Sequence, residues 1–376
     1  MKALGCLLLV ACGGAAADDA TPEGARGTWR ETSVVGVPAP RVHHSAVWTG
    51  SEMLVWGGRR PGWINGLGDG ARYDPVRDVW RPMSTEDAPS ARHEHGAVWT
   101  GSEMVVLGGR NYWLGALGEP GAYDPVHDRW RRLPTEGGPS PRFGHATVWT
   151  GSEVLVWGGA DALGLLATGA RYRPDLDRFA PISTQGAPPP AQDAAFAFSA
   201  GRFFVWNGGD AKAGKPIVGG GIYDPGNDAW SEVAQEGAPR WTHRTLALPI
   251  GDDILVWGDI QGGSASARYS PGTNTWVAVR GEGAPRQRGC VAAVFTGEVA
   301  ILFGGAVATG MGGERTLGDG ALFDPRTGQW GALGLEGAPS PRKCAPSVWT
   351  GTEMIVWGGA DDTTVVGTGG RLRLGR

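Results

Sequence analysis

The sequence contains no run of lysine or arginine, and its charge is close to balanced. Across 376 residues, 34 Lys and Arg stand against 38 Asp and Glu, giving a net charge of -4 and an isoelectric point near 6.0. This balance argues against a nucleic-acid-binding protein, which typically carries a basic surface. No Gly-x-Ser-x-Gly, His-Glu-x-x-His or phosphate-binding glycine loop stands out either. The sequence therefore predicts a non-catalytic protein with no cofactor and no nucleic-acid partner.

What the sequence does contain is glycine and tryptophan together. It has 65 Gly and 27 Pro, yet it keeps 18 Trp. A disordered chain rich in Gly and Pro would lack those aromatic side chains. The combination predicts short strands joined by frequent turns, with a core built from rings.

The N-terminus carries a short apolar stretch from Ala3 to Ala11, too short to span a bilayer as a mature helix. It ends in Leu-Val-Ala before Cys12, which resembles the lipobox of bacterial lipoproteins. That resemblance implies cleavage before Cys12 and a lipid on its sulfur, so residues 1–11 are a signal peptide and 12–26 a flexible tether. The implied location is the outer membrane or cell surface, periplasm-facing included, with membrane contact through the lipid only. The alternative is an ordinary signal peptide in which Cys12 is incidental.

A repeat of 46 to 54 residues fills the rest of the chain. The segment AVWTGSEMLVWGG, ending at Gly58, returns in clear form with ends at Gly109, Gly159 and Gly359, and in weaker form three times more. An aromatic residue before Asp-Pro follows, as at Tyr73, and then a lone aromatic such as Trp80.

These landmarks are similar to kelch repeats, and the period agrees with that family. The resemblance implies an all-β fold, a seven-bladed β-propeller of four-stranded blades over residues 27–376, in one domain. We expect strands at 45–49, 53–56, 71–73 and 79–83 in the first repeat. The last repeat lacks its fourth strand, and Trp29 lies 51 residues before Trp80. An N-terminal strand should therefore complete the last blade and leave a closed, monomeric ring.

Loops between the second and third strands differ most from repeat to repeat, and binding specificity normally lies in such loops. Trp63, Tyr112 and Trp113 lie in two of them, outside the repeat positions. They are candidate ligand-binding residues that could stack on a sugar or clamp a peptide. The alternative is that these loops simply fold over their own blades.

Histidines recur three residues after an arginine that opens the repeat, at His44, His95, His145 and His243. They should lie near the axial mouth on the face of the variable loops. They could bind a transition metal, or each could hydrogen-bond the loop of its own blade as a structural residue. Their repetition favours the structural interpretation. The arginines are expected to pair with acidic residues four or six positions earlier, such as Glu86.

Two cysteines, Cys290 and Cys344, open the innermost strands of adjacent blades. Cys290 lies four residues after Arg286 and Cys344 two after Arg342, which is the same parity along a strand. Equal parity points both side chains the same way around the ring and so argues against a disulfide, although an oxidising compartment would favour one.

The function that the sequence predicts is a non-catalytic binding or scaffold protein at the bacterial cell envelope, which presents its variable loops to a glycan or protein partner. The alternative is a metal-dependent, oxidase-like enzyme at the histidine-lined mouth, because kelch propellers include galactose-oxidase-like copper enzymes. That chemistry needs two Tyr ligands, one of them crosslinked to Cys. Five of the six Tyr occupy repeat positions here and only Tyr112 does not.

Overall fold

A computed structural model of the chain describes residues 26–375, apart from 61–64, 211, 214, 240–242, 260–265, 280 and 310–312. The expected signal peptide, Cys12 and most of the expected tether lie outside the described residues, as does Trp63.

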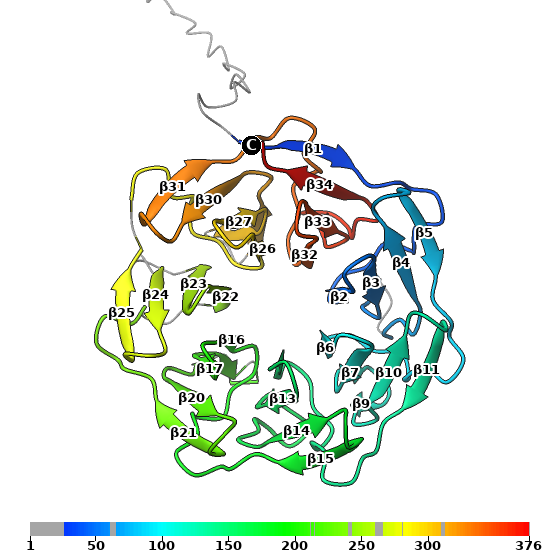
Figure 1. The fold of residues 1–376 in the computed structure, drawn as a ribbon, viewed down its shortest axis with the longest axis vertical. Coiled ribbons are helices and arrows are strands. Elements are labelled where there is room, and N and C mark those ends of the chain that lie inside the picture. The colour runs from blue at the N-terminus through cyan, green and yellow to red at the C-terminus, as the bar shows by residue number, and fades with distance from the viewer. Residues whose placement is uncertain are drawn as a thin grey trace, which may run out of the picture.

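Every regular element of the described chain is a β-strand, and the strands form seven four-stranded sheets in a ring (Figure 1). This confirms the predicted seven-bladed β-propeller. We number the blades 1 to 7 in chain order. Within each blade the first strand lies nearest the axis and the fourth lies at the rim.

The strands of blades 1 to 4 are β2 (Ser45–Trp48), β3 (Met53–Trp56), β4 (Gly70–Asp74) and β5 (Val79–Pro82); β6 (Gly96–Trp99), β7 (Met104–Leu107), β10 (Gly121–Asp124) and β11 (Arg129–Arg132); β12 (Ala146–Trp149), β13 (Val154–Trp157), β14 (Gly169–Arg173) and β15 (Arg178–Pro181); and β16 (Ala195–Ser199), β17 (Arg202–Trp206), β20 (Gly220–Asp224) and β21 (Ala229–Glu232). Those of blades 5 to 7 are β22 (His243–Ile250), β23 (Asp253–Asp259), β24 (Ala267–Ser270) and β25 (Thr275–Ala278); β26 (Ala292–Phe295), β27 (Ala300–Phe303), β30 (Gly320–Asp324) and β31 (Gln329–Ala332); and β32 (Ser347–Trp349), β33 (Met354–Trp357), β34 (Gly369–Arg373) and β1 (Thr28–Glu31). Three small hairpins stand in the loops: β8 (Arg110–Asn111) with β9 (Gly115–Ala116), β18 (Gly209–Asp210) with β19 (Lys215–Pro216), and β28 (Ala306–Thr309) with β29 (Gly313–Thr316).

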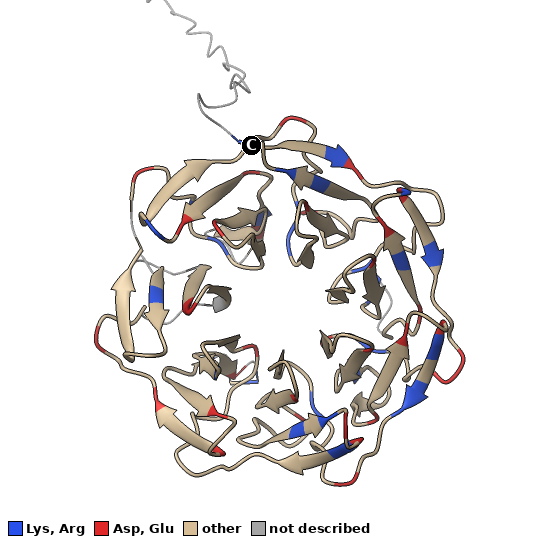
Figure 2. Ribbon diagram, in the orientation of Figure 1, with Lys and Arg blue, Asp and Glu red and all other residues tan. Residues whose placement is uncertain are grey.

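The hydrophobic core lies between the blades rather than within them. Met53, Val55 and Tyr73 of blade 1, for example, pack against Ile355 and Trp357 of blade 7. Each of the seven buried clusters is shared by two neighbouring blades in this way. The second strands are therefore covered on both faces, which explains why their sequences are continuously apolar. Figure 2 shows the matching distribution of charge, with few charged residues on the inner strands and most on the outer strands and loops.

The N-terminal strand closes the ring as predicted. β1 pairs antiparallel with β34, with Thr28 opposite Arg373 and Glu31 opposite Gly370, so the two ends of the chain share blade 7 (Figure 1). Trp29 is buried at the boundary with blade 6, where its indole N–H donates to Gly334 O at 3.0 Å.

Adjacent blades are also joined through the Asp-Pro turns. In blade 1 the turn ends at Asp78, which has a left-handed backbone (φ 54°). Its Oδ1 accepts a hydrogen bond from the Tyr73 hydroxyl at 2.5 Å. The same carboxylate accepts the backbone N–H of Ser33, which belongs to the segment arriving from blade 7. Blades 2 and 4 repeat this arrangement.

No segment of the described chain forms a helix with the length and apolar character needed to cross a bilayer.

Candidate functional site

Because the strands are antiparallel, the start of the first strand, the end of the second and the start of the third all lie on one face, which we call the loop face. A buried arginine organises this face in each of five blades. In blade 3, Arg142 donates from Nε to Ser140 O (3.0 Å) and from Nη1 to Gly158 O (3.0 Å) and Thr168 O (2.7 Å). Arg41, Arg92, Arg288 and Arg342 make the corresponding bonds. Burial lowers the pKa of Arg142 to about 10.

The expected partners of these arginines were wrong. Arg92 pairs with Glu119 and Arg41 with Asp69, each just before the third strand, and not with the preceding acidic residues such as Glu86. In blade 6 the buried position belongs to Arg288 and not to Arg286, whose carbonyl accepts the Arg288 Nε–H. The reason is that the buried guanidinium must satisfy carbonyls that the loops leave unpaired, and those lie inside the blade.

The predicted histidines lie between blades. The His44 ring meets Trp357 of blade 7 edge-on at 5.4 Å, and the His95 ring meets Trp56 of blade 1 in the same way at 5.1 Å. Burial, followed by the Arg41 charge, lowers the pKa of His44 to about 3. The pKa of His145 is also lowered to about 3, by burial and then by Arg142.

The hydrogen bonding expected of these histidines is corrected by the structure: His95 Nε2 lies 2.9 Å from Ser45 Oγ of the preceding blade, and not against its own loop. His243 begins β22, and its side chain lies outside the described part of the chain. Among the described residues, no three His, Cys, Asp or Glu side chains gather as a metal site would require.

The glycine pairs provide the space that these histidines fill. Gly57 and Gly58 have φ of 68° and 94°, in the left-handed region that favours glycine. A Cβ on Gly57 would lie 2.6 Å from His95 Cε1, and one on Gly58 would lie 2.8 Å from His44 Cβ. The pair therefore has to be glycine both for its backbone conformation and for the packing of two blades.

Above this shared frame, the residue after the buried arginine pairs with the residue after the glycine pair. The backbone bridges are Val42 with Arg59, His93 with Arg110, Phe143 with Ala160, Gln192 with Gly209, Gly289 with Ala306 and Lys343 with Ala360. The backbone is thus repeated while the side chains change. Bulky polar and aromatic residues collect in blades 1 to 3, whereas blade 6 has only Gly and Ala at the two positions.

A cleft of about 590 Å³ opens in this sector of blades 1 to 3. It is lined by Arg59, His93, Arg110, Asn111, Tyr112, Gly115, Ala116, Phe143, Asp161 and Ala162. Its walls are the β8–β9 hairpin of blade 2 and the loop of blade 3, and its floor is the bridge layer just described. This cleft is the candidate functional site.

Glu94 fixes the floor of the cleft. Its carboxylate lies 2.7 Å from Arg110 Nε and 3.4 Å from His93 Nδ1. Burial alone would raise the pKa of Glu94, but the hydrogen bonds from His93 and Arg110 outweigh it and lower the pKa to about 2. The pair also holds the Arg110 guanidinium 4.5 Å above the Phe143 ring. Arg110 is therefore a positioned group rather than a mobile surface charge.

Tyr112 and Trp113 occupy the tip of the β8–β9 hairpin, as their loop position predicted. They are 63% and 71% exposed, and their rings meet edge-on at 5.1 Å. Asn111 holds the hairpin by donating from Nδ2 to Ala91 O (3.0 Å) and by accepting the Trp113 N–H (3.1 Å). Tyr112 lines the cleft and Trp113 stands beside it. The third predicted residue, Trp63, lies outside the described residues.

Comparison with known families agrees with the geometry. Residues 23–159, from blade 1 to the inner strands of blade 3, match the family model described as the KLHDC2/KLHL20/DRC7 Kelch-repeats domain. Together with the ring of seven repeated blades, this match supports a kelch-repeat β-propeller. No curated protein matches the chain.

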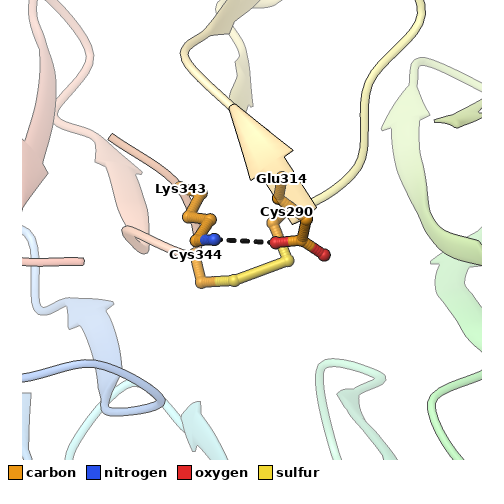
Figure 3. Close-up of a disulfide and its surroundings, with 4 residues drawn as sticks. All are labelled: Cys290, Glu314, Lys343 and Cys344. Carbon is orange, nitrogen blue, oxygen red and sulfur yellow. Dashed lines mark hydrogen bonds and ion pairs between the residues drawn. A yellow bond between two sulfur atoms is a disulfide. The ribbon is translucent and has the colours of Figure 1, made fainter. Parts of the chain in front are cut away.

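The sequence argument against a disulfide was also wrong. Cys290 and Cys344 form a disulfide between blades 6 and 7, with their Cα atoms 4.6 Å apart (Figure 3). Both residues precede their strands and have left-handed backbone, with φ of 55° and 51°, so strand parity does not apply to them. Measured from the true buried arginines, Arg288 and Arg342, the two cysteines also occupy the same repeat position. The Lys343–Glu314 ion pair (2.7 Å) lies beside the bond.

Sequence reasoning found Tyr112 and Trp113 but missed Arg59, Arg110 and Asp161. Asp161 gave no such signal, because blades 4 and 7 also carry Asp at its repeat position, as Asp210 and Asp361. Arg59 and Arg110 stand at the first position after the glycine pair, where blades 3, 4, 6 and 7 carry Ala or Gly. For these two arginines the signal was present in the sequence as a repeat position that departs from its own consensus. Finding it required the knowledge that this position faces the axial mouth of the kelch propeller.

Proposed function

We propose that this kelch propeller is a non-catalytic binding protein whose loop-face cleft receives a glycan or protein partner. One observation carries the proposal: at a position with a repeated backbone, blades 1 and 2 carry Arg59 and Arg110 where blades 3, 4, 6 and 7 carry Ala or Gly. His93 and Phe143 stand at the bridging position of blades 2 and 3, beside these arginines in the same cleft. Residues that serve only the fold recur from blade to blade, as Arg41, Arg92 and Arg142 do. Side chains that differ from the repeat and line an exposed cleft are expected where a specific ligand binds.

The fixed contacts of the cleft favour recognition over catalysis. Glu94, the partly buried carboxylate beneath the lining, is held by His93 and Arg110, and its pKa of about 2 suits a permanent ion pair rather than a proton carrier. The described predicted histidines are packed between blades below the cleft. The outer strand of each blade has only four residues and so offers a short edge for pairing with another chain, and we propose that the protein acts as a monomer.

We further propose that the protein is anchored at the bacterial cell envelope by a lipid on Cys12. The lipobox-like end of the apolar segment supports this location. The Cys290–Cys344 disulfide supports it independently, because such bonds persist mainly in oxidising compartments. The tether enters the propeller at β1, on the outer rim of blade 7, which would leave the loop face accessible.

Binding is tested with envelope extract separated into protein and saccharide fractions and passed over the immobilised protein. A double variant, Arg59→Ala with Tyr112→Ala, should lose retention of a component that the wild type holds. Both side chains are exposed, so the melting temperature should not change. Val126→Ala, an exposed residue of the opposite face, is the control and should retain the component. Equal retention by the wild type and the double variant would contradict the proposed site.

The anchor is tested by detergent phase partition after expression in a bacterium with two membranes. The wild type should enter the detergent phase, because a diacylglycerol group is strongly apolar, and Cys12→Ala should move to the aqueous phase. Cys6→Ala, which alters a cysteine inside the apolar segment, should partition as the wild type does. A Cys12→Ala protein that still enters the detergent phase would rule out lipid attachment at this residue.

A further inference from the structure

We propose that the ligand of the loop-face cleft is a neutral oligosaccharide, an inference that rests on the binding function proposed above. Three properties of the cleft select this class: free aromatic faces at its rim, planar polar groups with unused hydrogen-bonding atoms, and a balanced charge.

The aromatic surface is the first property. The Phe143 ring in the floor is already covered by the Arg110 guanidinium at 4.5 Å. Tyr112 and Trp113 are instead mostly exposed, and their rings stand at 87° to each other. The hairpin that carries them is fastened by two hydrogen bonds of Asn111, so the rings are held near the cleft. Rigid, exposed rings of this kind stack on the apolar face of a sugar ring with little loss of conformational entropy.

The second property is a set of planar polar groups with free atoms. The Arg59 side chain makes no hydrogen bond or ion pair with a described residue, and Arg110 uses Nε and Nη2 on Glu94 while Nη1 has no such partner. Asp161 accepts the backbone N–H groups of Leu163 and Gly164 with Oδ1, which leaves Oδ2 to accept. Guanidinium and carboxylate groups can each bind two adjacent hydroxyls at once, which matches the vicinal diols of sugars.

The charge of the cleft separates the ligand classes. The charge of Arg110 is neutralised by Glu94, which pairs with it from outside the lining, and Arg59 is matched by Asp161 within the lining. An acidic peptide or an acidic polysaccharide would meet Asp161 as a like charge, and a basic one would meet Arg59. A neutral ligand that offers many hydroxyls satisfies both signs without leaving a buried charge unpaired.

The experiment measures binding of the full-length protein in detergent to three probe sets: neutral hexasaccharides of glucose, galactose, mannose and N-acetylglucosamine, an oligogalacturonate, and a random peptide library. Titration calorimetry and quenching of tryptophan fluorescence are the readouts. We expect at least one neutral hexasaccharide to bind with a Kd below about 1 mM and the oligogalacturonate to bind at least about tenfold more weakly. Tyr112→Ala and Asp161→Ala should each weaken the neutral sugar by about tenfold or more.

A matched control exists in blade 7. Asp361 makes the same turn as Asp161, since its Oδ1 accepts the N–H groups of Thr363 and Thr364, but it lies outside the cleft. Asp361→Ala should therefore disturb its loop equally and leave sugar affinity unchanged. Peptide binding that depends on Tyr112 and Arg59, without saccharide binding, would overturn the glycan and leave the binding function standing. Failure to bind any of the saccharides overturns the glycan inference, and binding function falls only if the envelope experiment also shows no dependence on the cleft.

Discussion

At the scale of single residues, an arginine side chain has a different role in this ring according to its repeat position. Arg142 is fully buried, donates to five oxygen atoms and has its pKa lowered to about 10. Arg59 is exposed and makes no such bond with the described residues. Both are arginines beside a glycine pair of the loop face. The repeat separates these two arginines, because Arg142 has equivalents in four other blades and serves the frame, whereas Arg59 has an equivalent only in Arg110 and is available for a ligand.

The buried histidines should make the propeller sensitive to acid. Because the pKa of His145 falls from 6.5 to about 3 on folding, only the unfolded chain takes up a proton between those values. Stability is therefore lost as pH falls through this window, by about 2 kcal/mol per histidine between pH 7 and pH 5. His145→Val, which copies Val291 of blade 6, should remove that share of the pH dependence in urea denaturation. Thr147→Val, a buried neighbour that does not titrate, should keep it. Equal pH dependence in His145→Val and the wild type would refute the assignment.

At the scale of elements, the strands could be predicted and the small hairpins could not. The apolar run Met53–Trp56 is bounded by a Gly-Ser turn and a glycine pair, and this pattern predicts a short strand covered on both faces. The β8–β9 hairpin depends instead on the Asn111 side chain, which folds back onto Ala91 and Trp113. Such a local side-chain contact leaves no periodic signal. The same holds for the site, because Arg59 and Arg110 belong to two different blades and line one cleft only once the ring is formed.

The disulfide shows a second limit at this scale. Side-chain alternation is a property of extended backbone, and it fails at Cys290 and Cys344 because both residues are left-handed and precede their strands. Other blades place His43, Glu94 and Asp193 at this position, also with positive φ. Hydrogen bonds join neighbouring members, such as Asp193 N to Gly144 O at 2.8 Å and Cys344 N to Cys290 O at 3.0 Å. The cysteines are thus one pair in a series of inter-blade contacts around the mouth.

At the scale of the whole molecule, stability depends on closure, because each buried cluster belongs to two blades. Blade 7 obtains its outer strand from the start of the chain, and Trp29 fills the cluster between blades 6 and 7, where its ring lies 4.7 Å from Phe303. Removing β1 exposes the edge of β34 and opens this cluster at the same time. The damage should spread, since blades 6 and 1 each pack against blade 7.

Deletion of residues 27–33 should therefore lower the melting temperature of the entire ring and make unfolding less cooperative in calorimetry. Trp29→Ala alone should lower the free energy of unfolding by about 3–5 kcal/mol, the range for removing a large buried aromatic. Arg30→Ala, on the same strand but exposed, is the control and should have little effect. A synthetic peptide of residues 26–36 should restore the deleted protein in a concentration-dependent way, because it binds only the folded ring. The same peptide with Trp29→Ala should fail to do so. If the deleted protein melts like the wild type, β1 does not close the ring; if it unfolds and no peptide rescues it, its loss acts on folding before the ring is formed.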